Sequence, residues 1–231
     1  MTEERCEVAE TKGKKKKPRR TPLSRDRILK RAIRIADKSG LDALSMRKIA
    51  QLLGVEAMSL YNHVKNKDDI LDGMVEIVAA EIEVPTAGGD WKEQMRRRAT
   101  SAHGVLMEHP WAAMLLMSRV NIGPVMLHYV DATLGCLLGA GFGFALADHA
   151  WNALDSYVYG YTLQSLNFPF APDEYKGAAA EFMPQLPMQN YPHLAGLSLE
   201  VIEGRHDGLH DLAFGLELLL DGLERLRLSS L

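Results

Sequence analysis

Residues 53–67, which read LGVEAMSLYNHVKNK, place a glycine before a short helix-forming run that ends in tyrosine, histidine and lysine side chains. Tyr61, His63 and Lys65 form either a catalytic cluster or part of a small helix that is presented to a polyanion. A general base needs an orienting partner and a pocket. The nearby Asp68 and Asp69 are better explained as the first turn of the next helix, where carboxylates favour the helix dipole. We therefore favour the second interpretation.

The residues around this stretch predict three short helices, over 24–39, 45–53 and 56–62. The first two begin at serines, which are common helix caps, and end before glycines, which are common stops. Gly54 makes the turn between the second and third helices. Three short helices with such a turn are typical of a helix-turn-helix unit.

The charge of the chain is divided between its two parts. Residues 1–67 contain 18 Lys and Arg against 8 Asp and Glu, a balance of +10. Residues 68–231 contain 9 against 22, a balance of -13, and the two give the formal net charge of -3. A basic N-terminal segment followed by an acidic segment indicates that the N-terminal segment binds a polyanion such as nucleic acid.

Residues 1–21 are expected to form a disordered basic arm, because nothing apolar in the lysine-rich run can build a core. Such an arm can contact phosphates or insert into a minor groove. The alternative is a solubilising leader that does little.

The composition excludes several classes of protein. With 231 residues, 47% of them hydrophobic and 25% charged, the chain is typical of a soluble globular protein. Two cysteines, Cys6 and Cys136, imply no disulfide framework and fit a reducing compartment. No apolar run is long enough to span a membrane and no signal peptide is evident, so a cytosolic protein is expected. No zinc spacing, phosphate-binding loop or nucleophile elbow is present, so we expect no metal, no cofactor and no enzyme.

Helical periodicity continues to the end of the chain, and no segment alternates with the period of a strand. Helices are expected from Asp68 and over 91–108, 112–120, 124–140, 144–167 and 207–228, with residues 169–192 as a separator. We therefore predict an all-α protein with two folded parts. These are a helix-turn-helix domain over 22–67 and a second helical domain over 68–231, to which the family resemblance described below assigns effector binding and dimerisation.

The last predicted helix has a very broad apolar stripe, which includes Leu209, Leu212, Leu216, Leu219, Leu220, Leu223 and Leu226. A terminal helix of this kind needs cover on two sides. The helix over 144–167 has a matching stripe that includes Trp151 and Tyr161. We predict a homodimer formed through these two helices; a large monomeric core is the alternative.

The helix-turn-helix geometry also predicts which side chains meet DNA. The N-terminal residues of the third helix reach base edges, and here they are Ala57 and Met58, which suit contact with a thymine methyl. Ser59 and Tyr61 can bind phosphates, and Lys65 and Lys67 follow where the chain crosses the backbone. His63 is expected to support the packing of this helix on the next. On the second helix, Ser45 suits a phosphate at the helix terminus and Arg47 suits a guanine edge.

Residues 24–82 resemble the DNA-binding domain of the tetracycline-repressor (TetR) family, through the segments LSMRKIAQLLGV and LYNHVKNKDDILD. The segments GFGFALADHAWNALDSYVYGYTL and HDLAFGLELLLDGLERL resemble the drug-responsive branch of the same family. The resemblance implies a dimeric transcriptional regulator, most simply a repressor released from a palindromic operator by a small effector. It implies base contacts at Arg47, Ala57 and Met58, and phosphate contacts at Ser45, Ser59, Tyr61 and Lys67. The family's archetype has polar or proline residues at the positions of Ala57 and Met58, so a different operator is expected.

The resemblance also bears on the effector. The archetype binds a drug-chelated magnesium ion through a histidine, but residues 110–127 contain none. An apolar or aromatic effector is therefore expected. Nine residues lie on the helices that enclose the family's pocket: Trp91, Met95, His103, Met107, Trp111, Met114, Met117, His128 and Trp151. For each of them, plain core packing is the alternative. For the whole protein, the alternatives are a weakly specific DNA-compacting protein and a regulator that needs no ligand.

Overall fold

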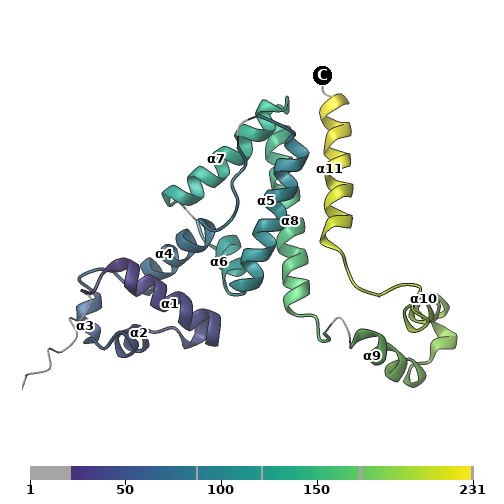
Figure 1. Ribbon diagram of the computed structural model, residues 1–231, viewed down its shortest axis with the longest axis horizontal. Helices are drawn as coiled ribbons and strands as arrows, with labels where there is room; N and C mark the ends of the chain where they lie inside the picture. The colour runs from purple at the N-terminus through teal and green to yellow at the C-terminus, as the bar shows by residue number, and fades with distance from the viewer. Residues whose placement is uncertain (1–21, 87, 121, 172–173, 230–231) are drawn as a thin grey trace, which may run out of the picture.

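The computed structural model describes residues 22–86, 88–120, 122–171 and 174–229, and this part of the chain contains helices and no strand (Figure 1). The all-α prediction is confirmed. The basic arm predicted over residues 1–21 lies outside the described residues. The helices are α1 Arg25–Ser39, α2 Met46–Leu53, α3 Ala57–Leu60, α4 Lys67–Ala79, α5 Trp91–Glu108, α6 Ala112–Ser118, α7 Pro124–Gly139, α8 Phe144–Leu166, α9 Tyr175–Phe182, α10 Pro192–Ile202 and α11 Leu212–Ser229. Short 3-10 turns lie at η1 Leu41–Ala43, η2 Met183–Gln185 and η3 Met188–Asn190.

The caps expected for the first two helices are present. The Ser24 hydroxyl accepts a hydrogen bond from the backbone N–H of Arg27 at 3.3 Å, and the Ser45 hydroxyl accepts one from Lys48 at 3.2 Å. Gly40 and Gly54 follow the two helices with φ of 73° and 67°. A left-handed backbone of this kind favours glycine, so the sequence sets both helix ends locally.

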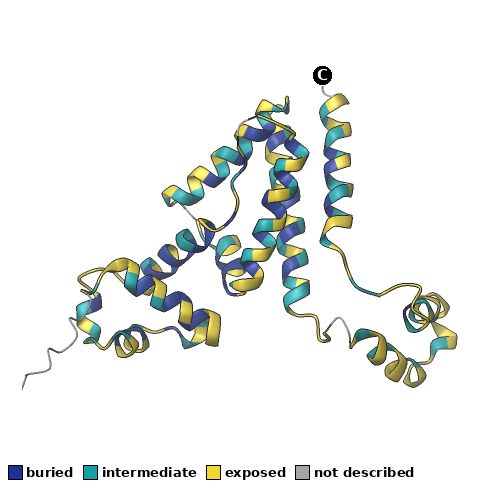
Figure 2. Cartoon of the chain, viewed as in Figure 1, coloured by how far each residue is buried: buried dark blue, intermediate teal, exposed yellow. Residues whose placement is uncertain are grey.

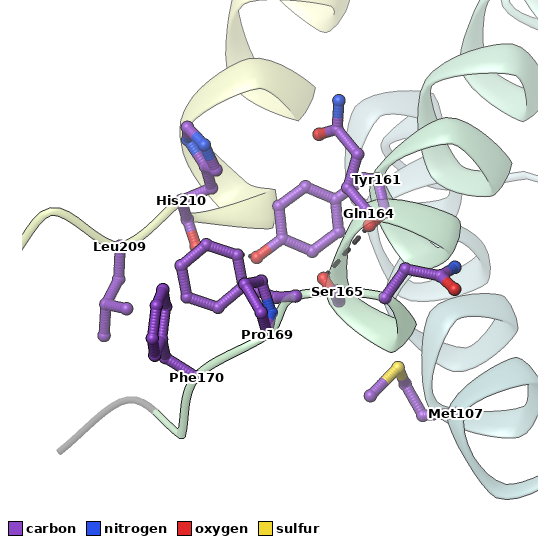
Figure 3. Close-up of a pocket in the computed structure, with 10 residues that line it drawn as sticks. Met107, Tyr161, Gln164, Ser165, Pro169, Phe170, Leu209 and His210 are labelled. Atoms are coloured by element: carbon purple, nitrogen blue, oxygen red, sulfur yellow. Dashed lines mark hydrogen bonds between the residues drawn. The ribbon is translucent and has the colours of Figure 1, made fainter. Parts of the chain in front are cut away.

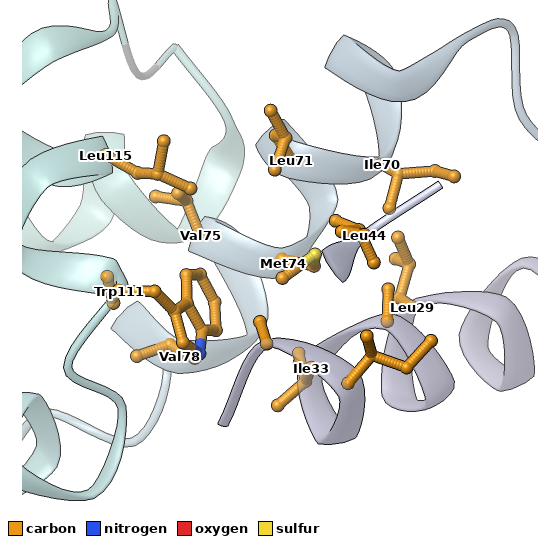
Figure 4. Close-up of a cluster of buried hydrophobic side chains, with 14 of the residues drawn as sticks. Leu29, Ile33, Leu44, Ile70, Leu71, Met74, Val75, Val78, Trp111 and Leu115 are labelled. Atoms are coloured by element: carbon orange, nitrogen blue, oxygen red, sulfur yellow. The ribbon is translucent and has the colours of Figure 1, made fainter. Parts of the chain in front are cut away.

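The first apolar core joins the helix-turn-helix unit to α4 and α6 (Figure 4). Leu29 and Ile33 of α1 face Ile70 and Met74 of α4 in this core. Trp111 and the start of α6 pack on the other side of α4, where Val75 and Val78 also lie. The core therefore does not stop at the predicted boundary between residues 67 and 68.

The second core is formed by α5, α7, α8 and α11. It contains a buried cation, Arg98, which forms an ion pair with Asp155 and donates a hydrogen bond to the Tyr129 hydroxyl at 2.9 Å. Trp151 donates to the same carboxylate at 2.7 Å. Because a buried charge is costly without partners, this network fixes how α5, α7 and α8 pack together.

Two expected helices have different ends in the structure. The third helix stops at Leu60 rather than residue 62, because the N–H groups of Tyr61 and His63 bond three residues back and form turns. The last helix starts at Leu212 rather than residue 207. Gly208 has a left-handed φ of 74°, and the Asp211 carboxylate accepts from the N–H of Ala213 and so caps the helix start.

Residues 169–192, expected to be a separator, include helix α9 and end where helix α10 begins. Helices α9 and α10 pack on each other and project away from the body of the molecule, at the far right of Figure 1. Pro192 occupies the first turn of α10, a position that suits proline because it lacks a backbone N–H. Among the described helices, none is long and apolar enough to cross a membrane.

Candidate DNA-binding surface and ligand cavity

The start of α2 carries an exposed cap, Ser45, and an exposed cation, Arg47. Ser45 is exposed, and its hydroxyl uses only its acceptor on the N–H of Lys48, so the O–H remains able to donate to a phosphate. Arg47, two residues further on, is also exposed. Below them, Ile49 and Ala50 are buried in the first core and hold the helix in place.

Helix α3 separates an outward face from an inward face within four residues. The Met58 side chain is 74% exposed, whereas Leu60 is fully buried. Ala57 is half-buried and packs against the first core, and Ser59 is half-buried as well. Tyr61, directly after the helix, is 48% exposed. A large exposed methionine on a helix with a fixed inner face is available for contact with another molecule.

The turn after α3 is held by Asp69 of α4. Its carboxylate accepts a hydrogen bond from the N–H of Lys65 at 2.8 Å and from the Arg25 guanidinium at 2.7 and 2.9 Å. The hydrogen bond from Arg25 is the main cause that lowers the pKa of Asp69 below its ordinary value. The side chain of Asn66 caps α4. This network leaves Lys65 and Lys67 exposed on either side of the helix start.

His63 does not have the support role that the sequence suggested. Its side chain is exposed, and Val64 and Leu60 fill the space between α3 and α4. The physical reason is the turn at 61–63, which directs the chain so that the aliphatic residue, and not the imidazole, enters the core.

A cavity of about 650 Å³ lies where α8 ends and α11 is about to begin (Figure 3). Apolar and aromatic side chains dominate its lining, with a few amide, hydroxyl and imidazole groups among them. The lining residues are Met107, Tyr161, Gln164, Ser165, Asn167, Phe168, Pro169, Phe170, Leu209 and His210. The Tyr161 hydroxyl donates to the carbonyl of His210 at 2.7 Å, which joins the two sides of the cavity. Its volume and lining are those of a site for a drug-sized ligand.

The nine residues expected at an effector site do not converge on one cavity. Met107 lines the cavity, and His103 lies behind it, with Nδ1 2.9 Å from the Thr162 hydroxyl and its ring edge-on to Tyr161. The other seven lie elsewhere: Trp91, Met95 and Trp111 are buried in the cores, Trp151 bonds to Asp155, and Met114, Met117 and His128 are exposed. Burial lowers the pKa of His103, which favours its neutral form.

Sequence reasoning missed most of this lining. The sequence assigns Tyr161 to the dimer stripe, Leu209 to a helix, and residues 169 and 170 to a separator. The available signal was the phenylalanine-proline-phenylalanine run at 168–170, since two aromatic residues in a connecting segment need apolar cover. Phe170 packs against Phe168 and Tyr175, with ring centroids 6.1 Å apart in each pair.

Comparison with known proteins identifies the family. Residues 28–74 match the model for bacterial regulatory proteins of the tetR family, and residues 84–227 match the model for the tetracyclin repressor-like C-terminal domain. The chain belongs to the TetR family. The resemblance found in the sequence is thereby confirmed for both parts of the chain. This TetR-family protein is a ligand-responsive, DNA-binding transcriptional regulator.

Individual relatives agree with the family models. The TetR-family chain is 32% identical to the transcriptional repressor DrrR1 of Streptomyces coeruleorubidus over 222 residues, which is 90% of this chain and 81% of that one. It is 30% identical to the class D tetracycline repressor protein of Escherichia coli over 209 residues, with 87% and 89% covered. An HTH-type transcriptional regulator of Saccharopolyspora erythraea is 37% identical over 139 residues, with 60% and 59% covered.

The fold is shared with solved structures of the same family. The Streptomyces coelicolor protein ActR in complex with actinorhodin matches with a TM-score of 0.73 and 33% identity. The match covers 89% of this chain and 98% of that one.

Proposed function

We propose that this protein is a homodimeric repressor that binds a pseudo-palindromic operator and leaves it when an apolar or aromatic effector binds. The observation that carries the proposal is the paired surface of α2 and α3. Arg47 and Met58 are exposed on it, while the residues directly beneath, Ile49 and Leu60, are buried. Side chains that project from two rigidly held helices are what reading DNA in the major groove requires.

Within this surface, the proposal divides the contacts by chemistry. Arg47 would read a guanine edge, and Ala57 and Met58 would press on thymine methyl groups. Ser45, Ser59, Tyr61, Lys65 and Lys67 would bind phosphates, which sets the register and carries no sequence information.

Dimerisation through α8 and α11 is supported by the large apolar residues that these helices leave exposed in the single chain. Exposed positions are yellow in Figure 2. Phe144 at the start of α8 is 78% exposed, and Phe214 and Leu218 on α11 are 71% and 61% exposed. The opposite side of α11, with Leu216 and Leu220, is buried against its own chain. A helix that is apolar on both sides fits cover by a second copy.

The effector is proposed to bind in the cavity at the end of α8. Tyr161, Phe168 and Phe170 offer aromatic faces there, and Gln164 and His210 offer hydrogen bonds. The ActR structure with actinorhodin supports a ligand of this broad class. A competing site is the pocket that the family resemblance implies, with residues such as Met117.

A release experiment tests the proposal. The operator is first recovered from random duplex DNA, and its release from the protein is then followed by fluorescence anisotropy as actinorhodin is added. We expect Phe170→Ala to need a roughly tenfold higher concentration for half release, because an aromatic contact is lost. Met117→Ala is the matched control and should release as the wild type does. If Met117→Ala alone needed a higher actinorhodin concentration for half release, the effector would bind at the site near Met117.

Two outcomes would contradict the proposal. Binding with no sequence preference would rule out a pseudo-palindromic operator. Specific binding that actinorhodin and a panel of other aromatic compounds leave unchanged would rule out an effector of the proposed class. No catalytic step is part of the proposal.

A further inference from the structure

Glu76 on α4 caps a helix that belongs to the other core. Its carboxylate oxygens accept hydrogen bonds from the backbone N–H groups of Val125 at 3.0 Å and Met126 at 3.2 Å. These N–H groups lie in the first turn of α7, where no partner exists within the helix. The residue at the cap position is Gly123, which offers no side chain. A carboxylate from 49 residues earlier in the chain therefore supplies the cap, and the helix dipole favours its charge.

Gly123 makes room for this contact. Its φ of -70° is one that any residue adopts, so the backbone does not require glycine. A Cβ atom at this position, however, would overlap the Glu76 carboxylate. The glycine is thus explained by the cap and not by the turn.

The contact lies where the two cores meet. Met126 packs against both cores, as do Val105 of α5 and Tyr159 of α8. A cavity of about 300 Å³ beside it, lined in part by Glu76, Val120 and Ile122, leaves space between α4 and the chain that leads into α7. The Glu76 carboxylate bridges α4 and the first turn of α7 at the edge of this cavity.

On its other side, α4 is fixed to the DNA-binding surface. Arg25 of α1 bonds the Asp69 carboxylate, and Gly73 lies so close to Leu29 that an added Cβ would be 2.7 Å from its methyl group. Asp69 also holds the N–H of Lys65. A movement of α4 would therefore carry α1 and the turn after α3 with it.

We propose that Glu76 is the positioning residue that couples α7 to the DNA-binding half of the molecule. The first turn of α7 and the position of α4 change together because one carboxylate holds both. This inference rests on the proposed function, in which a ligand in the cavity at the end of α8 must alter a surface built on the first core. It identifies Glu76 as the contact through which ligand binding changes the position of α4.

Hydrogen exchange tests the coupling with operator DNA as the probe. Exchange is measured in the segments 67–79 and 124–130, with and without an operator duplex. In the wild type we expect the duplex to slow exchange in both segments, by roughly fivefold or more in the second. In Glu76→Gln the duplex should slow exchange in 67–79 only. Without DNA, the amides of Val125 and Met126 in this variant should exchange roughly tenfold faster.

Asp72→Asn is the matched control. Asp72 lies one turn before Glu76 on α4, and its carboxylate contacts Arg119 instead of α7. This variant should respond to the duplex in both segments, as the wild type does. An equal response of 124–130 in the wild type and Glu76→Gln would overturn the proposal and leave Glu76 with a purely structural role.

Failure of the proposed function is separate from failure of this inference. If no duplex binds, the function is wrong, and the coupling is then measured from the urea dependence of exchange. We expect the two segments of the wild type to open with one shared free energy and those of Glu76→Gln to open separately. Identical behaviour of the two proteins would overturn the coupling.

Discussion

At the scale of single residues, Arg47 and Lys67 are both exposed and both assigned to the DNA contact, and we expect their loss to have different effects. Arg47→Ala should relax preference at one base position at a cost of about 1–3 kcal/mol. Lys67→Ala should weaken binding to all sequences and reduce the salt dependence by about one unit of slope. Competition binding against single-base operator variants, at several salt concentrations, measures both effects.

Arg205→Ala is the control for that comparison, since Arg205 follows α10 on the projecting arm and its loss removes one positive charge far from α2 and α3. It should leave both quantities unchanged. Equal effects of Arg47→Ala and Lys67→Ala on every sequence would contradict the assigned division between base and phosphate contacts.

Asp69 gives the DNA-binding half a defined pH dependence. Its pKa is lowered below 3.8, chiefly by the hydrogen bond from Arg25, so the charged carboxylate stabilises the folded state above that pH. The stabilisation is lost as the pH falls through the lowered folded pKa. Asp69→Asn should lower the free energy of unfolding at pH 7 by about 1 kcal/mol, a value reduced by solvent screening of Arg25.

Urea unfolding between pH 7 and pH 2.5 tests this expectation. The difference between wild type and Asp69→Asn should shrink below about pH 4, because the carboxyl of the unfolded wild-type chain takes up a proton there while the folded one is still charged. A difference that stays constant over the whole range would mean that the charge of Asp69 contributes nothing.

The residues that sequence reasoning assigned correctly are those with local causes. Ser24, Ser45 and Gly54 act on groups within a few residues, so their spacing alone indicates their roles. The sequence assigns Asp69 only to an acidic helix start and assigns no role to Glu76. Their partners Arg25 and Val125 lie 44 and 49 residues away in the sequence, and no local sequence pattern relates residues that far apart.

At the scale of elements, the exposed side of α11 carries the proposed dimer contact. Phe214→Asp should shift the protein from dimer to monomer, because a charge would be buried without a partner in the interface. Light scattering or sedimentation at several protein concentrations measures the shift. Leu52→Asp changes an apolar residue that is 43% exposed on α2, outside the proposed interface, and should remain dimeric. Dimers that survive Phe214→Asp would place the interface elsewhere.

The long helices with clear periodicity and caps were predicted within a few residues, and α5 at its observed bounds. The errors fall where tertiary contacts set the structure. The start of α11 is fixed by Tyr157 and Tyr161 of α8, whose hydroxyls donate to the carbonyls of Leu212 and His210. Helices α9 and α10 are not predicted from the sequence, which indicates a separator over residues 169–192, although Pro192 begins a helix.

At the scale of the whole molecule, the two cores do not coincide with the two predicted domains. Helices α4 and α6 pack with α1–α3, and α5, α7, α8 and α11 form the second core. The division predicted between residues 67 and 68 followed the end of the helix-turn-helix motif. Amphipathic periodicity shows that a helix buries one face, but it does not show which neighbour covers that face. A regulator of this kind needs the two cores to be joined, since a ligand bound beside α8 and α11 of the second core must change the surface built on the first.

The central claim is that this molecule reads a symmetric DNA sequence as a dimer. Selection from random duplex DNA, followed by footprinting of the enriched sequences, tests it most directly. We expect one pseudo-palindrome whose half-site centres lie about one helical turn apart, roughly 34–36 Å, with one dimer bound at each site. Protection spread along the duplex, with no enriched palindrome, would contradict the account.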